Sequence, residues 1–545
     1  MVRRSTALGG RPLTLAAGTA AAAPIVVSSV RAVRSGWEPT DDKAIIATRA
    51  YDVLTRHAPL VGQYSMAGRV AGHTTHDLGP MLYWLLAVPV RLGGPGAMAA
   101  TMGAVNAAAV VAVVALAHSR GGRALMLMTA VAVALMCRSL AAETFHDIWN
   151  PAAALFPFLL LIFLCWSLAC GRRRLLPAAV LVASFVVQAH LAFLAPTAGM
   201  LAVGLAGMAV PRPAGGRREL VVVAAVALAV ACACWAPAAI DEVTHHPGNL
   251  SSVVRAAATR KATLGAAVGA HAVVRAVGVR PWWLTVPGSR WDRKHDVAAT
   301  PSPTRTWTAV VLLAALAAMG VAGAAQRRID VATAAAIGFT LCAGLGAVAA
   351  ETPAVPVLAA TVGYTLWWGS QCGMWVWLVL AWGAWLALRG PIAARARLRT
   401  RSLRASTVAS VAGLAAAALA GTAAAASEAP DQHVALYRPI SAIAARLQTA
   451  IPRGRTVRLD GRLDGATQPF KPAVRFALAR RGIRVLSRKA APRNGDWYEL
   501  DHRAYDERIT LTDRPRRPPA AALLIRCGFA EAGRRHSVFV WLSRR

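Results

Sequence analysis

Long apolar runs recur along the whole chain, and they restrict the possible folds more than any other feature. About 20 apolar residues in a helix cross the hydrocarbon core of a bilayer, which is about 30 Å thick. The composition agrees, because only 16% of the 545 residues are charged, whereas soluble domains carry about 25%. The sequence therefore predicts a polytopic α-helical membrane protein with about 11 transmembrane helices.

Two of the expected spans depend on the charges that flank an apolar run. The run 175–210 is too long for one helix and has basic groups on both sides, so we divide it near His190. The run 353–388 lies between Glu351 and Arg389, so we expect it to cross once, with residues 354–369 at the membrane surface. The expected spans are 13–33, 98–117, 124–141, 151–169, 175–190, 192–210, 219–238, 306–325, 330–349, 370–388 and 404–426.

The short loops between these spans alternate in charge. Every second loop is short and Arg-rich, and the segment 389–404 continues this pattern. Cytoplasmic loops carry such an excess of Lys and Arg. The other loops hold most of the acids and most of the histidines, so we place 34–97 and 239–305 outside. This gives a cytoplasmic N-terminus, a plasma-membrane location and an external C-terminus. We expect the first span to be retained; a cleaved signal peptide is the alternative.

The last part of the chain, residues 427–545, reads as a small α/β domain outside the membrane, after a transmembrane part covering 1–426. Segments rich in β-branched residues predict strands. Two segments, 435–448 and 470–482, predict helices. The strand segments are 456–461, 483–488, 508–513, 521–527 and 536–542.

The net charge of +35 first suggests a nucleic-acid partner. Topology accounts for much of the Arg, so we expect no nucleic acid. From Ser427 onward the chain holds 24 Lys and Arg against 11 Asp and Glu. Anionic lipid headgroups or anionic envelope polymers are candidate neighbours of this region, and a solvated basic surface is the alternative.

The sequence lacks the glycine-rich motifs that bind nucleotides, GxxxxGK[ST] and GxGxxG in a strand–loop–helix setting. The predicted cytoplasmic loops are also too short to fold a nucleotide site. A nucleotide-activated substrate from the cytoplasm is therefore not expected. Chemistry on the outer face would instead need a substrate carried by a lipid.

The external loop 34–97 holds the strongest candidate for a catalytic group. Asp41 and Asp42 precede a helical pattern, immediately after the first span. Helix capping by Thr40 or Asp41 is one explanation. The alternative is that Asp42 removes a proton from an acceptor hydroxyl. Arg49 and Asp52 follow on the same helix, and Arg49 is a candidate ion-pair partner or phosphate contact.

Other polar residues gather at the predicted outer ends of later spans. Asp147 lies in a short loop with Glu143 and His146, and a polar turn is its plainer explanation. Gln188 and His190 interrupt an apolar run, where polar residues point either to function or to a hydrogen bond between helices. Asp241 and Arg255 follow the seventh span, where Arg255 is a candidate contact for a lipid phosphate. His73, His76 and Asp77 are candidate metal ligands, but their spacing matches no known ligand set.

Six short motifs appear in a characteristic order over roughly the first 370 residues. They are PLVGQYS (59–65), a Gly79-Pro80 aromatic segment, NAAA (106–109), WNP (149–151), QAHL (188–191) and PGNLS (247–251). In this order the chain resembles actinobacterial polytopic proteins related to the GT-C-type membrane glycosyltransferases. That superfamily includes the dolichyl-phosphate-mannose protein mannosyltransferases and the aminoarabinose transferases. The C-terminal region matches more loosely.

The resemblance implies transfer of a sugar from a polyprenyl-phosphate donor, with an acid of the first external loop as the base. Asp42 fits that acid, with Asp41 second, and Asp147 fits a second acid. It also implies a divalent metal ion, for which Asp147 and His190 are the candidate ligands. Where His-Pro-Gly-Pro is expected, this chain reads Asp77-Leu78-Gly79-Pro80, which weakens any histidine role there.

The leading prediction is therefore a membrane glycosyltransferase that acts on a cell-envelope glycan, lipid or protein at the outer face. A transporter or lipid flippase is the first alternative, and it predicts broken helices in paired halves, which the sequence does not show. A non-catalytic envelope scaffold is the second. It predicts that the outer acids do not share a cavity.

Overall fold

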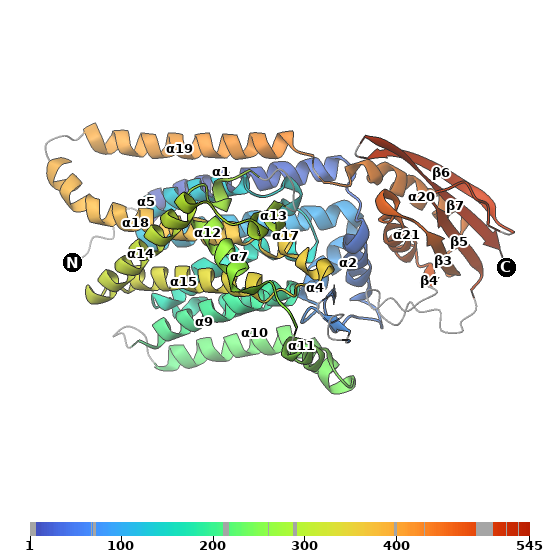
Figure 1. The fold of residues 1–545 in the computed structure, drawn as a ribbon, viewed down its shortest axis with the longest axis horizontal. Helices are drawn as coiled ribbons and strands as arrows, with labels where there is room; N and C mark the ends of the chain where they lie inside the picture. The colour runs from blue at the N-terminus through green and yellow to red at the C-terminus, as the bar shows by residue number, and fades with distance from the viewer. Residues whose placement is uncertain are drawn as a thin grey trace.

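The structure is a computed structural model of the 545-residue chain. It describes residues 7–66, 68, 72, 74–210, 217–259, 261–286, 292–396, 401–429, 431–486, 505–518, 520–531 and 533–544. The N-terminal and C-terminal parts of this chain lie at opposite ends of the elongated molecule (Figure 1).

Most of the chain forms a bundle of long helices that lie side by side (Figure 1). The long helices are α1 (Ala7–Arg34), α5 (Gly94–Cys137), α7 (Leu155–Ala169), α8 (Leu176–Ala189), α9 (Leu194–Ala209), α10 (Arg217–Thr244), α14 (Pro303–Ala325), α15 (Ile329–Ala350), α18 (Gly369–Ala396) and α19 (Arg401–Ser427). Within the described residues, eight spans are long and apolar enough to cross a membrane. The predicted α-helical membrane fold is confirmed, whereas the count of eleven crossings stays a prediction.

Two predicted spans, 98–117 and 124–141, fall into one helical element that reverses direction. Gly122, in the middle of α5, has φ 67° and ψ −158°, which an L-residue rarely adopts. The His118 ring lies 2.7 Å from the Thr14 hydroxyl, and the Ser28 hydroxyl donates to the Ala142 carbonyl at 2.7 Å. Thr14 and Ser28 lie in opposite halves of α1, so the chain reaches one end of α1 at His118 and has returned to the other by Ala142, just after α5 ends.

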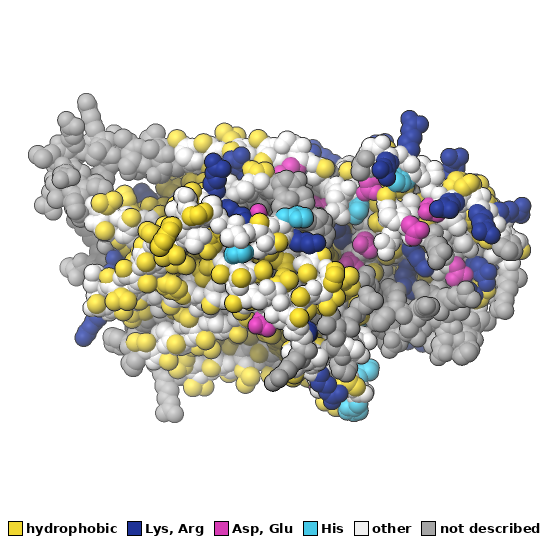
Figure 2. All heavy atoms as spheres, in the orientation of Figure 1, with side chains coloured by type: hydrophobic (Ala, Val, Ile, Leu, Met, Phe, Trp, Pro, Cys, Tyr) yellow, Lys and Arg dark blue, Asp and Glu magenta, His cyan; other side chains and the backbone are white. Residues whose placement is uncertain are grey.

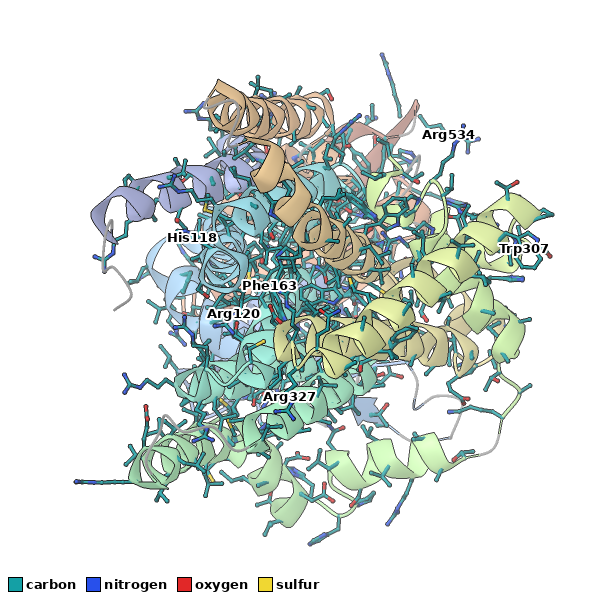
Figure 3. The ribbon with its side chains drawn as sticks, turned by 90° about the vertical axis from the view of Figure 1, so that its left-hand side faces the viewer. His118, Arg120, Phe163, Trp307, Arg327 and Arg534 are labelled. Carbon is teal, nitrogen blue, oxygen red and sulfur yellow. The ribbon has the colours of Figure 1, made fainter. Side chains whose placement is uncertain are left out.

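The centre of the bundle is packed with aromatic rings. The span Asn150–Ala169, which contains α7, is the most enclosed of the eight, with 94% of its most apolar stretch buried. In α14 only 17% of the corresponding stretch is buried. Phe163 of α7 contacts Trp166 and Trp375 edge to face. Seen along the helices, Phe163 lies in the middle and Trp307 of α14 at the periphery (Figure 3). The apolar surface of the outer helices is what a bilayer would cover (Figure 2).

The predicted basic loops meet at one end of the bundle. Cys170 of the loop 170–174 lies 3.7 Å from Thr333, next to Arg328 and Asp330. Arg174 contacts Glu219 at 2.5 Å, which joins the loop before α8 to the start of α10. The segments that carry the predicted outer acids lie at the opposite end, beside the C-terminal domain (Figure 1). The division of loops into two sets is thus seen, and which set is cytoplasmic stays a prediction.

Short elements cover that second end. They are α2 (Asp41–Asp52), β1 (Tyr64–Ser65), β2 (Thr75–His76), α4 (Met81–Leu92), η1 (Ala142–Phe145), α6 (Asn150–Ala153), η3 (Leu191–Phe193), α11 (Asn249–Ala258), η4 (Trp282–Leu284), α13 (Asp292–Ala298), α16 (Pro356–Ala359) and α17 (Val362–Thr365). Helix α4 buries Leu82, Tyr83 and Leu86 and exposes Val88 and Leu92.

The predicted external loop 239–305 also contains an apolar helix that packs in the bundle. Helix α12 (Gly265–Val277) lies along α15 and α18. A β-carbon on Gly269 would lie 2.5 Å from the carbonyl oxygen of Gly346, so the two backbones approach closely because both residues are glycine. Arg293 of α13 is buried, and its guanidinium lies over the Trp282 ring at 4.9 Å.

The C-terminal domain is a five-stranded mixed sheet with helices on one face. All five predicted strands are confirmed as β3 (Thr456–Arg462), β4 (Arg484–Leu486), β5 (Glu507–Thr512), β6 (Ala522–Glu531) and β7 (Arg534–Arg544). The order is β4-β3-β5-β7-β6, with β3 parallel to β4 and β5. The predicted helices are α20 (Tyr437–Ala450) and α21 (Phe470–Ala479), with η5 (Val434–Leu436) and η6 (Gly465–Thr467) as short turns.

One hydrophobic core joins this domain to the segment between α1 and α5. Trp37, Ile46 and Leu86 belong to the same buried cluster as Ile440 and Val474 of the C-terminal domain. Helix α2 packs against α21. The C-terminal domain is therefore seated on α2 rather than merely tethered by the chain.

Candidate active site

A polar cavity of about 300 Å³ opens at the end of the bundle where α2 lies. Five separate segments contribute polar side chains to it: the segment 42–77, the start of α6, the turn after α8, the end of α15 and the segment around α17. Its main polar lining residues are Asp42, Gln63, Tyr64, Ser65, Asp77, Asn150, His190, Glu351, Thr352, Thr361, Tyr364 and Thr365. The volume falls at the lower end of the range for small-ligand sites, about 300–1,000 Å³.

Asp42 reaches this cavity because α2 begins at its rim. Thr40 is the residue that precedes the helix, and its side chain makes no capping hydrogen bond. Asp41 is exposed and has φ 46°, whereas Asp42 is half-buried and lines the cavity. The positive end of the helix dipole favours a carboxylate anion in the first turn. Of the two neighbouring acids, the structure thus directs Asp42 toward the cavity.

Lys43, next in the chain, holds α2 in this position from its other side. Its ammonium lies 3.0 Å from Asp147 and 2.7 Å from Asp431, and all three side chains are buried. Burial by itself lowers the pKa of Lys43, but the charges of Asp147, Asp431 and Glu143 outweigh it and hold that pKa above its usual range. Burial likewise raises the pKa of Asp431, and the Lys43 charge outweighs this effect and leaves it below its usual range.

The ion cluster of Lys43, Asp147 and Asp431 therefore connects α2, the loop before α6 and the start of the C-terminal domain. Asp147 also accepts a hydrogen bond from the Trp149 N–H at 2.8 Å, and Glu143 accepts one from the Gln432 N–H at 3.0 Å. Asp147, the acid predicted to be second at the site, thus pairs with Lys43, and it is not among the residues that line the cavity. Its predicted role at the substrate stays a prediction.

Asp77 is a second carboxyl group in the cavity. It accepts hydrogen bonds from the Asn150 amide at 2.8 Å and from the Leu191 N–H at 3.3 Å. Burial raises the pKa of Asp77 well above its usual range, although these two donors oppose the shift. Asp77 therefore favours its neutral form, as a buried carboxyl group commonly does.

His190 lines another wall of the cavity, and Gln188 supports that wall without lining it. His190 lies in the turn between α8 and α9, and its Nδ1 accepts a hydrogen bond from the Ala192 N–H at 3.2 Å. Since Nδ1 is the acceptor in this bond, the neutral ring carries its proton on Nε2. The Gln188 amide donates to the Cys234 carbonyl at 2.8 Å, and its oxygen finds no partner within the described residues.

Two hydrogen-bonded anchors fix the loop that carries Asp77. The His76 N–H donates to the Asn249 side chain at 2.8 Å, and the Asn249 N–H donates to Asp241 at 2.8 Å. The Gln63 carbonyl accepts from the Asp77 N–H at 2.8 Å. Asp241 thus supports the site through Asn249. His73 lies outside the described residues.

The remaining predicted site residues lie away from the cavity lining. Arg49 contacts Asp52 at 3.5 Å on α2. Arg255 is exposed on α11. No Lys or Arg lines the cavity among the residues that the structure describes. Asp42 and His190 are therefore the two predicted residues that the fold brings together, and Asp77, Asn150, Glu351 and Tyr364 join them.

Sequence reasoning missed this second group for different reasons. The sequence suggests Asp77 only as a metal ligand, although its position before Gly79-Pro80 is typical of a loop residue. Asn150 appears in the sequence analysis only as part of the WNP motif. Glu351 and Tyr364 are far along the chain, and their arrival at the cavity depends on the packing of α15 and α17.

A metal site is not evident in the part of the chain that the structure describes. No group of three His, Cys, Asp or Glu side chains there is arranged to hold an ion. Asp147 is held in the ion cluster with Lys43, while His190 lines the cavity. These residues do not fit the predicted pair of ligands, so we derive no step through a metal.

An apolar groove of about 430 Å³ lies beside the polar cavity. It runs between α12 and α15 and is lined almost wholly by Ala, Gly and Val, with Phe339 and Cys342. On the last turns of α15, Ala347 and Ala350 line the groove, while Val348 and Glu351 line the polar cavity. The two spaces thus share one helix end.

No protein-family model and no curated protein matches the sequence. Among solved structures, ArnT from Cupriavidus metallidurans bound to undecaprenyl phosphate has a TM-score of 0.54 at 13% identity, over 98% of both chains. ArnT in the apo state has a TM-score of 0.53, also at 13% identity over 98% of both chains. At this identity the likeness shows the shared fold alone. It confirms the fold expected from the resemblance to GT-C-type membrane glycosyltransferases.

Proposed function

We propose that this chain is a membrane glycosyltransferase that moves a sugar from a polyprenyl-phosphate donor to a hydroxyl group of a cell-envelope acceptor. The observation that carries the proposal is the polar cavity lined by Asp42, placed at the end of an apolar bundle and beside an apolar groove. The ArnT fold supports it, because one ArnT structure is bound to undecaprenyl phosphate.

The two adjoining spaces match the two halves of such a donor. A prenyl chain is apolar and suits the groove lined by Ala270, Val273 and Ala347. The sugar and phosphate are polar and suit the cavity beyond Glu351. The head of such a lipid leaves the hydrocarbon where the prenyl tail ends. The lipid would therefore pass from the apolar groove into the polar cavity at the last turn of α15.

Asp42 acts as the general base in this scheme. An acceptor hydroxyl attacks the anomeric carbon of the sugar, and its proton passes to the Asp42 carboxylate. The bond between the anomeric carbon and the phosphate oxygen breaks, and polyprenyl phosphate leaves with the electron pair. Attack from the face opposite the phosphate inverts the anomeric configuration.

Neutral donors in the cavity are available for the leaving phosphate. Asn150 carries an amide and His190 a protonated Nε2, and donors already in position stabilise charge that develops in the transition state. The buried carboxyl of Asp77, in its neutral form, avoids repulsion of the phosphate. The predicted contacts from Arg49 and Arg255 stay predictions.

The decisive experiment compares two neighbouring substitutions in purified protein. Asp42→Asn keeps the size of the side chain but removes the base, so the release of polyprenyl phosphate from a radiolabelled polyprenyl-phosphate sugar should fall by at least about 100-fold. Envelope extract supplies the acceptor, and a panel of donors identifies the sugar.

Asp41→Asn is the matched control, because Asp41 is exposed and its loss removes the same charge one residue away. We expect it to retain most of the activity. Full activity of Asp42→Asn would refute the assignment of the base. Loss in Asp41→Asn alone would transfer the role to that residue.

A further inference from the structure

A second concave surface lies on the C-terminal domain, made by elements other than those of the polar cavity. It is a groove of about 470 Å³. It lies where the parallel strands β3 and β5 end together, since Arg462 and Thr512 are register partners. Asp464 and Asp513 follow these two strands. Ligands of α/β sheets commonly bind at the carboxyl ends of parallel strands.

Strands β6 and β7 supply the other wall of the groove. Arg526 of β6 lies opposite Phe539 of β7, and its guanidinium is 5.3 Å from the centre of that ring. Phe539 in turn packs on Trp541. The aromatic pair holds the Arg526 plane on the open face of the sheet, away from the helices. Arg535 and His536 extend the wall toward the hairpin.

The three arginines of the groove have no ion-pair partner in the part of the domain that the structure describes. Arg514, Arg526 and Arg535 are exposed and make no ion pair with any described residue. Other arginines of the same sheet are paired: Arg458 contacts Asp460 at 2.7 Å, and Arg544 contacts Glu507 at 3.7 Å. Three arginines without an ion pair thus line one groove, at the basic end of the molecule (Figure 2).

The groove also offers groups that recognise hydroxyls. Asp464 and Asp513 provide carboxylate acceptors, and Ser537 and His536 add polar contacts. A simple anion site would gain nothing from two carboxylates, because they repel the anion. A ligand that carries both hydroxyls and anionic groups would satisfy both sets, since arginine binds phosphate and carboxylate through paired hydrogen bonds.

We propose that this groove binds a saccharide that bears phosphate or carboxylate groups. The binding does not depend on the transfer reaction, so it can be tested independently of the role of Asp42. In a membrane glycosyltransferase such a site would hold an anionic envelope polymer next to the membrane.

Calorimetric titration of the full chain in uncharged detergent tests the site. The probes are tetragalacturonate for carboxylate, a phosphorylated oligomannose for phosphate, and the same oligomannose without phosphate. We expect one anionic saccharide to bind and the neutral one not to bind. The double substitution Arg526→Gln/Arg535→Gln should weaken binding by at least about tenfold, since each guanidinium donates charge-assisted hydrogen bonds.

The matched control is Arg516→Gln/Arg534→Gln, which removes the same charge outside the groove. Arg534 extends from the hairpin into solvent (Figure 3). We expect it to change the dissociation constant by no more than about twofold. An equal loss in the control would mean general electrostatic attraction. Failure of both anionic saccharides to bind, or displacement of the saccharide by sugar-free phosphatidylglycerol vesicles, would also overturn the proposal.

Discussion

Adjacent residues at the start of α2 have opposite surroundings. Successive side chains of a helix differ by about 100° in direction. Asp42 therefore lines the polar cavity while Lys43 enters a buried cluster with Asp147 and Asp431. One face of α2 therefore carries the proposed base, and the neighbouring face carries the lysine that holds the helix in place.

The close approach of Gly79 to Gln188 offers a prediction for the wall of the cavity. A β-carbon on Gly79 would overlap the Gln188 amide, which is buried. Gly79→Ala should displace that amide and its hydrogen bond to Cys234, with a loss of about 1–3 kcal/mol in the free energy of unfolding. Thermal unfolding and donor binding measure the effect.

Gly413→Ala is the matched control, because nothing lies within 4 Å of an added β-carbon there. We expect it to be neutral or slightly stabilising, as alanine favours helix. If both substitutions have equal effects, the contact with Gln188 does not shape the wall.

Helix α2 acts as the connecting element between the membrane part and the C-terminal domain. It packs on α4 and α21, and its Lys43 binds one carboxylate from each side. Removing one partner of a buried ion pair costs about 3–5 kcal/mol. Because Asp147 would remain, we expect Asp431→Asn to weaken the seating of the domain by about 3 kcal/mol. Hydrogen exchange of the α2 and α20 amides measures this seating.

The pH dependence of that seating follows from the direction of the Asp431 shift. Its pKa is lower in the folded protein than the ordinary 3.8, so the folded state resists protonation. Asp431 therefore contributes fully above that value, and the contribution is lost as the pH falls further. Exchange should rise below about pH 4 in the native chain. In Asp431→Asn this acid-induced rise should be smaller.

Asp506→Asn is the control for this element, because it breaks an exposed pair with Arg455 in the same domain. Exposed pairs contribute about 0–1 kcal/mol, so little change is expected. If Asp431→Asn leaves exchange in α2 and α20 unchanged, the cluster does not hold the domain.

At the scale of the whole molecule, the basic loops lie at one end and the cavity with the C-terminal domain at the other (Figure 1). The predicted orientation places the second end outside. A membrane-impermeant maleimide should therefore label Arg534→Cys in intact cells and should label Arg123→Cys only after permeabilisation. Both positions are exposed, so access to the thiol differs only by the side of the membrane. The reverse pattern would invert the topology.

The sequence alone determined the elements of this protein. Each predicted span overlaps a helix, and all five predicted strands of the C-terminal domain are present, because hydrophobic period and run length are local properties. The sequence also directed attention to Asp42 through its position after the first span. Within the sequence, only the resemblance to a known family distinguished Asp42 from Asp41 as the candidate base.

Only the tertiary structure decided which of the outer residues meet. Asp147, like Asp42, follows a predicted span, yet it pairs with Lys43, whereas Asp77, Glu351 and Tyr364 reach the cavity from distant segments. The reversal of α5 at Gly122 and the seating of the C-terminal domain on α2 are likewise invisible in local patterns. Side chains converge through contacts between segments hundreds of residues apart, and such contacts leave no period in the sequence.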